Sequence, residues 1–179
     1  MNKQVWIEKA LGLGIQEFEI YQSTTVEKEM TWFQGQMDTL VSSKVTGTSI
    51  RGIVDGKMAN MALEEIDDSM CETVLKSLIA QAHIISNEET DSLRKPEPIE
   101  YVKKDVTWNM ASTEYVKNIL QSLEAKILAY DPRVIQVGYL GYSQGSGSRS
   151  IVNSLGMDVQ DADEMQYIVA SVVVKENEE

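Results

Sequence analysis

The stretch 138-GYLGYSQGSGSRSIVNSLG-156 has the composition of a loop that could hold a phosphate group. A phosphate-binding loop needs the spacing G-x-x-x-x-G-K-[ST], followed by a helix whose N-terminus faces the phosphates. In 145-GSGSRS-150, Arg149 and Ser150 lead instead into Ile151 and Val152, a β-branched pair that favours a strand. The dinucleotide-binding fingerprint also requires a helix after its third glycine. We therefore interpret residues 144–148 as a turn between two strands, at 134–142 and 150–154, and residues 153–156 as a second corner.

The chain has one histidine and one cysteine, which restricts the catalytic chemistry available to it. A zinc site of the usual His/Cys kind cannot be assembled from one of each, and a nucleophilic serine or cysteine would depend on His83 as its base. Cys71 and His83 fall on one expected helix, about 18 Å apart, too far to share a proton. We interpret His83 as a structural or surface residue and Cys71 as a small packing residue.

Acidic residues occur in two groups that could suggest a metal site. The second group, 158-DVQDADE-164, resembles a calcium loop but lacks the central glycine and the terminal glutamate at the required spacing. It is interpreted as a solvated, polar turn. The first group lies before the second helix. The first group comprises Glu64, Glu65, Asp67 and Asp68.

Methionine and aromatic side chains in the first half could line a soft peptide-binding surface, although core packing is favoured. They are Met30, Met37, Met58, Met61, Trp32 and Phe33. The sequence thus assigns no catalytic, cofactor-binding or metal-binding residue.

Composition narrows the class of protein. The chain has 179 residues and a net charge of −12, from 16 Lys+Arg against 28 Asp+Glu, so nucleic acids and anionic membranes are disfavoured partners. No apolar run approaches the roughly 20 residues of a membrane span, and the first residues lack the pattern of a signal peptide. A single cysteine fits a reducing compartment, so we expect a cytoplasmic protein.

Apolar spacing predicts three main helices, at residues 2–13, 67–87 and 112–130. Gly14 ends the first helix, and Asp131-Pro132 ends the third. Asp67, Asp68 or Ser69 is expected to cap the second helix, with Asn87 at its end, and Ser112 to cap the third.

Alternating polarity predicts strands at 17–22 and 26–32 and two more within 46–65, joined by the turn dipeptide Asp55-Gly56. Residues 88–111, with Pro96 and Pro98, are expected to cross the surface. Further strands are expected at 133–144, 148–159 and 164–179. The order of elements predicts a single α+β domain over residues 1–179, with a largely antiparallel sheet and three helices packed on it.

The order of these segments resembles the N-terminal half of the TldD/PmbA family. The resemblance is carried by 17-EFEIY-21, 35-GQMDTL-40, 47-GTSIRGIVDGKMANMALEE-65 and the helix after 66-IDDS-69. Near the C-terminus, 149-RSIVNSLGMDVQDADEMQYIVASVVVKENEE-179 resembles the N-S-x-G segment of the family, with Asn153, Ser154 and Gly156 between two strands. This tract is closer to the PmbA (TldE-like) branch.

Members of this family have been described as modulators of DNA gyrase and implicated in proteolysis and peptide maturation. The resemblance implies that zinc is held by an H-E-x-x-x-H motif of a TldD-type partner subunit, which this chain lacks. Because family members are typically more than twice as long, we expect either an isolated N-terminal domain or a short relative.

Two functions from different classes follow. One is a non-catalytic domain of a zinc metalloprotease complex that handles unfolded or precursor peptides, where free sheet edges accept an extended peptide or a partner strand. The other is a stand-alone acidic adaptor that binds a protein partner or self-associates. A nucleotide-dependent enzyme is the weakest alternative.

Overall fold

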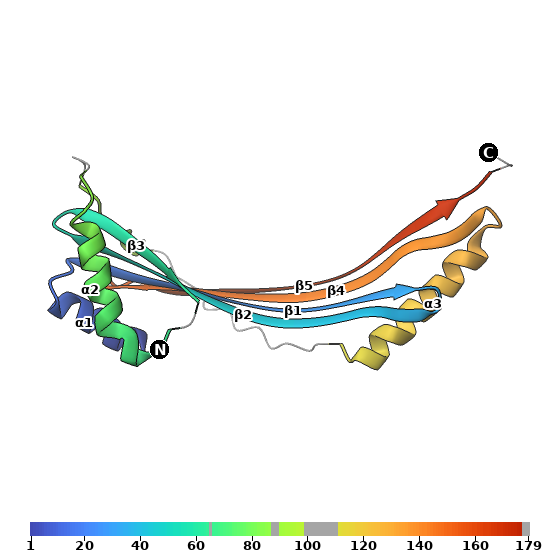
Figure 1. Cartoon of the computed structure of the whole chain (residues 1–179), viewed down its shortest axis with the longest axis horizontal. Helices are drawn as coiled ribbons and strands as arrows, with labels where there is room; N and C mark the ends of the chain where they lie inside the picture. Colours follow the sequence, from blue (N-terminus) through green and yellow to red (C-terminus); the bar gives the residue numbers. More distant parts are fainter. Residues whose placement is uncertain (65, 87–89, 99–110, 177–179) are drawn as a thin grey trace. The chain divides into compact units, whose positions relative to one another are not determined.

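The computed structural model describes residues 1–64, 66–86, 90–98 and 111–176. The elements in chain order are α1 (Lys3–Gly12), β1 (Glu17–Phe33), β2 (Gln36–Val54), β3 (Lys57–Leu63), the 3-10 turn η1 (Asp68–Met70), α2 (Cys71–Ala82), α3 (Thr113–Tyr130), β4 (Val134–Asn153) and β5 (Asp158–Val174). The strands form a sheet in the order β3-β2-β1-β4-β5 (Figure 1). The described part of the chain is therefore α+β, with an antiparallel sheet and three α-helices, as predicted.

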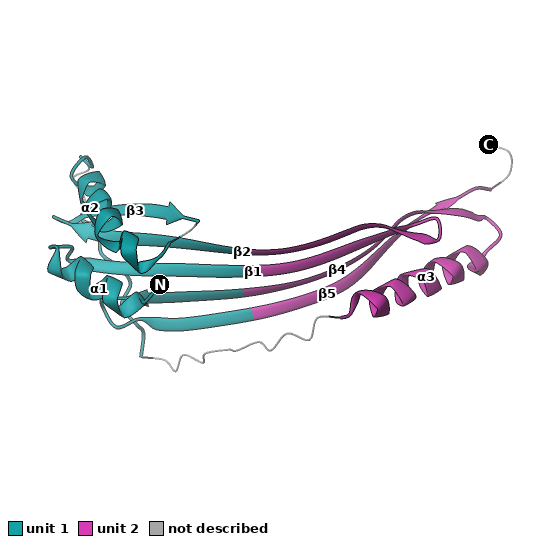
Figure 2. Cartoon of the chain, turned by 60° about the horizontal axis from the view of Figure 1, so that its bottom comes forward, with its two compact units in different colours: residues 1–24, 45–105, 148–162 teal, residues 25–44, 106–147, 163–179 magenta. Residues whose placement is uncertain are grey.

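Contacts divide the chain into two compact units (Figure 2). Unit 1 contains residues 1–24, 45–105 and 148–162, and unit 2 contains residues 25–44, 106–147 and 163–179. The boundaries fall inside β1, β2, β4 and β5, so each of these strands contributes to both units. The expectation of a single domain over residues 1–179 stays a prediction.

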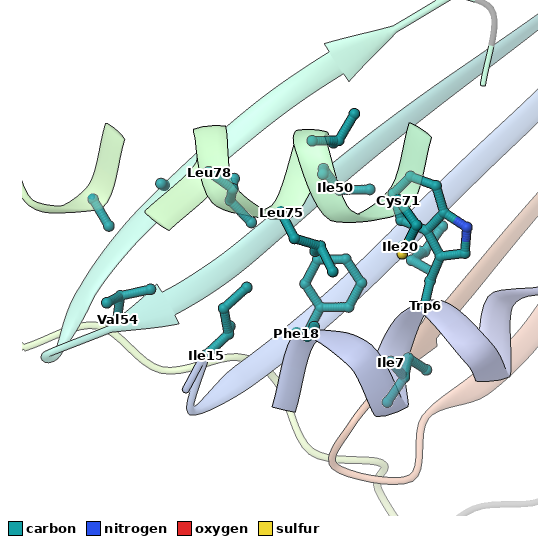
Figure 3. Packing of buried hydrophobic residues seen from close by; sticks show 14 residues of the cluster. Trp6, Ile7, Ile15, Phe18, Ile20, Ile50, Val54, Cys71, Leu75 and Leu78 are labelled. Carbon is teal, nitrogen blue, oxygen red and sulfur yellow. The ribbon is translucent and has the colours of Figure 1, made fainter. Parts of the chain in front are cut away.

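The core of unit 1 lies between the sheet and the helices α1 and α2 (Figure 3). Trp6 of α1 and Leu75 of α2 are fully buried against Phe18 and Ile20 of β1 and Ile50 of β2. These strand residues alternate along β1, because successive side chains of a strand point to opposite faces. One face of the unit 1 sheet is therefore apolar and covered by the two helices.

The core of unit 2 lies between α3 and one face of its own part of the sheet. Met30 and Trp32 of β1 pack with Val116 and Leu120 of α3 and with Leu140 of β4. The carboxylate of Glu124, on α3, is buried beside this core. Its Oε2 accepts hydrogen bonds from the Trp32 indole Nε1 at 2.8 Å and from the Gly35 N–H at 2.9 Å. Since Glu124 is only 8% exposed, these two donors fasten α3 to the β1–β2 hairpin.

Two hairpin turns use consecutive residues with positive φ. Asp55 and Gly56 have φ values of 50° and 74°, which confirms the predicted turn. Positive φ at both positions is typical of a type I′ turn, whose twist matches that of the flanking strands. Gln34 and Gly35, with φ values of 49° and 79°, form a second such turn between β1 and β2. The second turn was not predicted, because Gln-Gly is outside the usual turn dipeptides.

The helix predictions hold to within a few residues. Asn2 and Ser112 are the N-caps of α1 and α3, and each side chain accepts a backbone N–H. Of the three cap candidates for the second helix, Asp67 caps the preceding 3-10 turn η1, where it accepts the Ser69 N–H at 2.7 Å. The N-cap position of α2 itself is Met70, which makes no side-chain cap hydrogen bond. The predicted cap Asn87 lies outside the described residues.

The strand predictions were wrong in length. The segments 17–22 and 26–32 are one strand, β1, and the three C-terminal segments are two strands, β4 and β5. Residues 144–148 lie within β4 and are not a turn; Gln144 is fully buried there, and its Oε1 accepts from the Tyr142 hydroxyl at 2.6 Å. Glycine and serine tolerate extended backbone, and neighbouring strands on both sides of β4 supply the pairing that their low intrinsic preference does not.

Residues 90–98, the described part of the segment expected to cross the surface, have no regular secondary structure. Hydrogen bonds hold them against unit 1. The Asp91 N–H donates to the Gly56 carbonyl at 2.9 Å, and the Leu93 N–H donates to Glu17 Oε2 at 2.6 Å. The Leu93 side chain is buried, so this segment contributes to unit 1 as well as crossing its surface.

We predict that Glu124→Ala destabilises the protein by about 2–4 kcal/mol, because it leaves the Trp32 indole and the Gly35 N–H without an acceptor. Urea unfolding followed by circular dichroism measures the change. The control is Gln121→Ala, an exposed position of the same helix, which should change the free energy of unfolding by less than about 0.5 kcal/mol. Equal effects of the two substitutions would contradict the role given to Glu124.

Candidate functional site

The corner between β4 and β5 is built around the side chain of Asn153. Its Oδ1 accepts the N–H groups of Leu155 and Met157, both at 3.0 Å, and its own N–H donates to the Met157 carbonyl at 2.9 Å. Gly156 has a φ of 93°. The predicted corner at 153–156 is therefore confirmed, and an asparagine side chain closes it.

The same side chain joins three separate segments of unit 1. Asn153 Nδ2 donates to Glu19 Oε2 of β1 at 3.1 Å and to the carbonyl of Arg94, in the segment 90–98, at 2.9 Å. The neighbouring Ser154 pairs with β1, since its N–H donates to the Phe18 carbonyl at 2.8 Å and its Oγ accepts the Phe18 N–H at 2.9 Å. The N-S-x-G segment thus holds the end of β4 against β1.

Glu19 is a buried acidic residue, 3% exposed, on the sheet face opposite the helices. Arg51 of β2 donates to its Oε1 through Nε and Nη2, both at 2.7 Å, and Asn153 donates to its other oxygen. The Arg51 side chain is 43% exposed, so the ion pair reaches solvent through the guanidinium. With both oxygens hydrogen-bonded, this carboxylate is a structural anchor and is poorly placed to act as a general base.

A surface pocket of about 420 Å³ lies beside this ion pair. We call it the polar pocket. It is lined by Glu19, Tyr21, Ser49, Arg51, Asn60 and Ile151. The lining offers hydrogen-bonding groups and a cationic edge, and none of it is a histidine or a cysteine, so its chemistry suits binding of a polar group rather than nucleophilic catalysis.

Part of the glycine- and serine-rich stretch lines a second pocket, of about 500 Å³, in unit 1. Ser148, Arg149 and Ser150 of β4 reach it, together with Lys3 of α1, whose Nζ donates to Ser150 Oγ at 2.5 Å. The segment continues as strand into the Asn153 corner and then into β5. The helix that a phosphate-binding loop requires does not follow it, so this pocket lacks that geometry.

Cys71 and His83 lie at opposite ends of α2, as their spacing predicts. Cys71 is the first residue of the helix and is fully buried in the unit 1 core, and burial raises the pKa of its thiol. His83 is the C-cap residue, largely exposed, with its Nε2 3.6 Å from Asp55 Oδ2 of the hairpin turn. The thiol packs as a small apolar group, and the histidine is a surface residue.

The acidic segment 158–164 is not a turn, because these residues form the first part of β5. Alternating strand geometry sends successive side chains to opposite faces, which separates neighbouring carboxylates. Across residues 1–64, 66–86, 90–98 and 111–176, no three His, Cys, Asp or Glu side chains come close enough together to hold a metal ion. The same residues include no helix that is long and apolar enough to cross a membrane.

The methionine and aromatic residues divide between core and surface. Met30 and Trp32 are buried in unit 2, and Met61 packs against the unit 1 core, as the core interpretation predicted. Met37 and Phe33 are exposed, so for these two the interpretation was wrong.

A second candidate surface is the outer edge of β5, which we define as residues 163–174. β5 is the last strand in the sheet order, and every residue of this segment is exposed. Its large apolar side chains are Met165, Tyr167, Ile168, Val169, Val172, Val173 and Val174. An edge strand of this kind presents unpaired backbone groups to a partner. No pattern in the sequence distinguishes this edge strand from an interior one.

We predict that Asn153→Ala lowers the free energy of unfolding by about 2–4 kcal/mol, because it removes the acceptor of the corner and a donor to Glu19. The matched control is Asn60→Ala, an exposed position in the polar pocket, which should cost less than about 0.5 kcal/mol. Urea unfolding measures both.

Asn153→Asp separates the two roles of this side chain. It keeps the oxygen that accepts from Leu155 and Met157 but places a second carboxyl group beside that of Glu19. We expect Asn153→Asp to lower the thermal unfolding temperature, because Glu19 loses a hydrogen-bond donor and a second carboxylate is placed beside it. An unchanged unfolding temperature would contradict the contact with Glu19.

Two protein-family models match the chain, one in each half. Residues 18–85 match the PmbA/TldA metallopeptidase domain 1, and residues 107–179 match the PmbA/TldA metallopeptidase central domain. No curated protein matches the chain.

Solved structures share the fold. A proposed modulator of a DNA gyrase from Thermotoga maritima is 17% identical with a TM-score of 0.78, and TldE from Thermococcus kodakarensis is 18% identical with a TM-score of 0.78. Each match covers 98% of this chain and 40% of the other chain. A proposed modulator of DNA gyrase from Bacteroides thetaiotaomicron is 17% identical, with a TM-score of 0.72 and coverage of 97% and 40%.

The two family domains occur in sequence order and together account for most of the chain, including the segments that carried the sequence resemblance. The solved structures that share the fold match 97–98% of this chain. The chain therefore belongs to the PmbA/TldD metallopeptidase family.

Proposed function

We propose that the chain is a non-catalytic portion of a PmbA/TldE-like subunit that acts in a zinc metalloprotease complex. The observation that carries the proposal is the ordered match to domain 1 and the central domain of this metallopeptidase family. The fold shared with TldE from Thermococcus kodakarensis supports the choice of branch. The chain spans 40% of the length of that protein. The activity and the partners that we give to this chain are therefore part of the proposal.

Zinc would be held by a TldD-type partner subunit. An H-E-x-x-x-H motif contains two histidines, and this chain has one, which lies exposed at the end of α2. The reduced, buried Cys71 supports a cytoplasmic location for the complex.

The work proposed for this chain is to pair with other subunits and to guide an unfolded or precursor peptide. An extended peptide binds a sheet edge through backbone hydrogen bonds, which makes recognition largely independent of its sequence. In unit 1 the edge strand β3 is partly occupied, because the Met58 N–H donates to Asp91 Oδ2 at 3.0 Å. The outer edge of β5, in unit 2, is the more exposed of the two.

The test mixes this chain with a TldD-type subunit and an unfolded peptide. We expect the two proteins to co-elute in size-exclusion chromatography, and peptide cleavage to be several-fold faster than with the TldD-type subunit alone. This chain alone should cleave nothing, because it has no pair of histidines for the zinc motif.

The control is a TldD-type subunit whose zinc-binding histidines are replaced, which should still co-elute with this chain but lose cleavage. Separate elution together with unchanged cleavage would overturn the proposal. Binding to other proteins in the absence of any effect on cleavage would favour the stand-alone adaptor.

A further inference from the structure

Residues 90–98, which we call the strap, are fastened to unit 1 although they form no helix or strand. The first attachment is to the hairpin between β2 and β3. The Asp91 N–H donates to the Gly56 carbonyl at 2.9 Å, and Asp91 Oδ2 accepts the Met58 N–H at 3.0 Å. One end of the strap is thus fixed beside β3, the last strand of the sheet on that side.

The second attachment is the carboxylate of Glu17, the first residue of β1. Its Oε2 accepts the Leu93 N–H at 2.6 Å, and the Ser92 hydroxyl donates to its two oxygens at 3.2 and 3.1 Å. A carboxylate that accepts from backbone and hydroxyl groups makes stronger hydrogen bonds than a neutral acceptor. Glu17 therefore holds the middle of the strap against the start of β1.

The third attachment is the side chain of Asn153, in the corner between β4 and β5. Its Nδ2 donates to the Arg94 carbonyl of the strap at 2.9 Å and to Glu19 Oε2 at 3.1 Å. Because Glu19 also pairs with Arg51, the strap and this ion pair share one amide group. The N-S-x-G corner is therefore part of what holds the strap.

Little apolar surface keeps the strap in place. Leu93 is its one buried side chain, 5% exposed, and its other side chains are exposed or half-exposed. Fixing the backbone of such a segment costs conformational entropy, which the burial of one side chain offsets only in part. Segments of this kind open locally, at a lower free energy than global unfolding. The side-chain hydrogen bonds at its three attachments therefore decide how often the strap opens.

The position of the strap in the sequence gives its opening a consequence. The strap lies between the residues that match the two family domains, 18–85 and 107–179. While it is attached, the first part of the connection between these two segments is fixed on unit 1. When it opens, that part of the connection is released.

We propose that the strap is a releasable element. Residues 90–98 detach from unit 1 as one segment while the rest of unit 1 stays folded, and Glu17 and Asn153 set how often this occurs. The three attachments act together, because the opening of one lowers the entropic cost of opening the next. Every contact involved is made within unit 1, so the inference goes beyond the proposed protease complex and does not rest on it.

Hydrogen exchange of the 1–179 chain, followed by NMR spectroscopy, tests the proposal. The N–H groups of Asp91 and Leu93 are both hydrogen-bonded in the attached strap and report on its opening. We expect the two amides to exchange at rates that low concentrations of urea leave unchanged, because a local opening exposes little surface. Amides in the middle of α2 should exchange more slowly and accelerate with urea.

Glu17→Ala tests whether the attachments act together. We expect it to raise the exchange rate of Asp91 by about tenfold, although the acceptor of that amide, the Gly56 carbonyl, is unchanged. Glu17→Gln keeps one acceptor oxygen and should have a smaller effect. The matched control is Lys95→Ala, an exposed position of the strap, which should change the Asp91 rate by less than about twofold.

Asn153→Asp tests the third attachment, because an aspartate cannot donate to the Arg94 carbonyl. We expect the Asp91 rate to rise about tenfold and to remain independent of urea. The α2 amides show in the same experiment whether unit 1 of each variant is folded. An unchanged Asp91 rate would overturn the role given to Asn153.

Two results would overturn the proposal as a whole. If exchange at Asp91 and Leu93 has the same dependence on urea as exchange in α2, the strap opens only when unit 1 unfolds. If Glu17→Ala accelerates Leu93 and leaves Asp91 unchanged, the attachments open separately and the strap is not one segment. Neither result depends on whether the chain binds a TldD-type subunit.

Discussion

A carboxylate buried in a protein costs free energy unless hydrogen-bond donors surround it, and this requirement organises both units. In unit 1, Glu19 receives donors from Arg51 and Asn153, and those donors connect three strands and the segment 90–98. In unit 2, Glu124 receives the Trp32 indole and the Gly35 N–H and so fixes α3 on its hairpin. In each unit the polar contact is specific in direction, whereas the surrounding apolar packing is not.

The sequence predicted features that depend on neighbouring residues. The three helices follow from apolar spacing and capping side chains, and the Asp55-Gly56 turn from the positive φ that both positions adopt. The sequence-based prediction was wrong at residues 144–148. Glycine and serine indicated a turn there, but strands on both sides of β4 hold the segment extended. Local composition cannot reveal pairing partners that lie far away in the chain.

The candidate surfaces were harder to predict from the sequence than the fold was. The polar pocket depends on Glu19, Arg51 and the Asn153 corner, which lie in separate parts of the sequence. The one local signal was the N-S-x-G segment, in which Asn153 and Ser154 make the hydrogen bonds that close the corner and hold it against β1. The outer edge of β5 could not be identified, because its composition would suit a buried central strand equally well.

The hydrogen bonds between Phe18 and Ser154 also bear on how the chain reaches its native state. These residues are 136 positions apart, so β1 cannot pair with β4 until nearly the whole chain is present and a very long loop has closed. Proteins dominated by such distant pairings fold in milliseconds to seconds rather than microseconds. During that interval the edges of β1 and β4 that face each other in the native sheet are unpaired, and the acidic net charge of −12 then acts to keep partly folded chains apart.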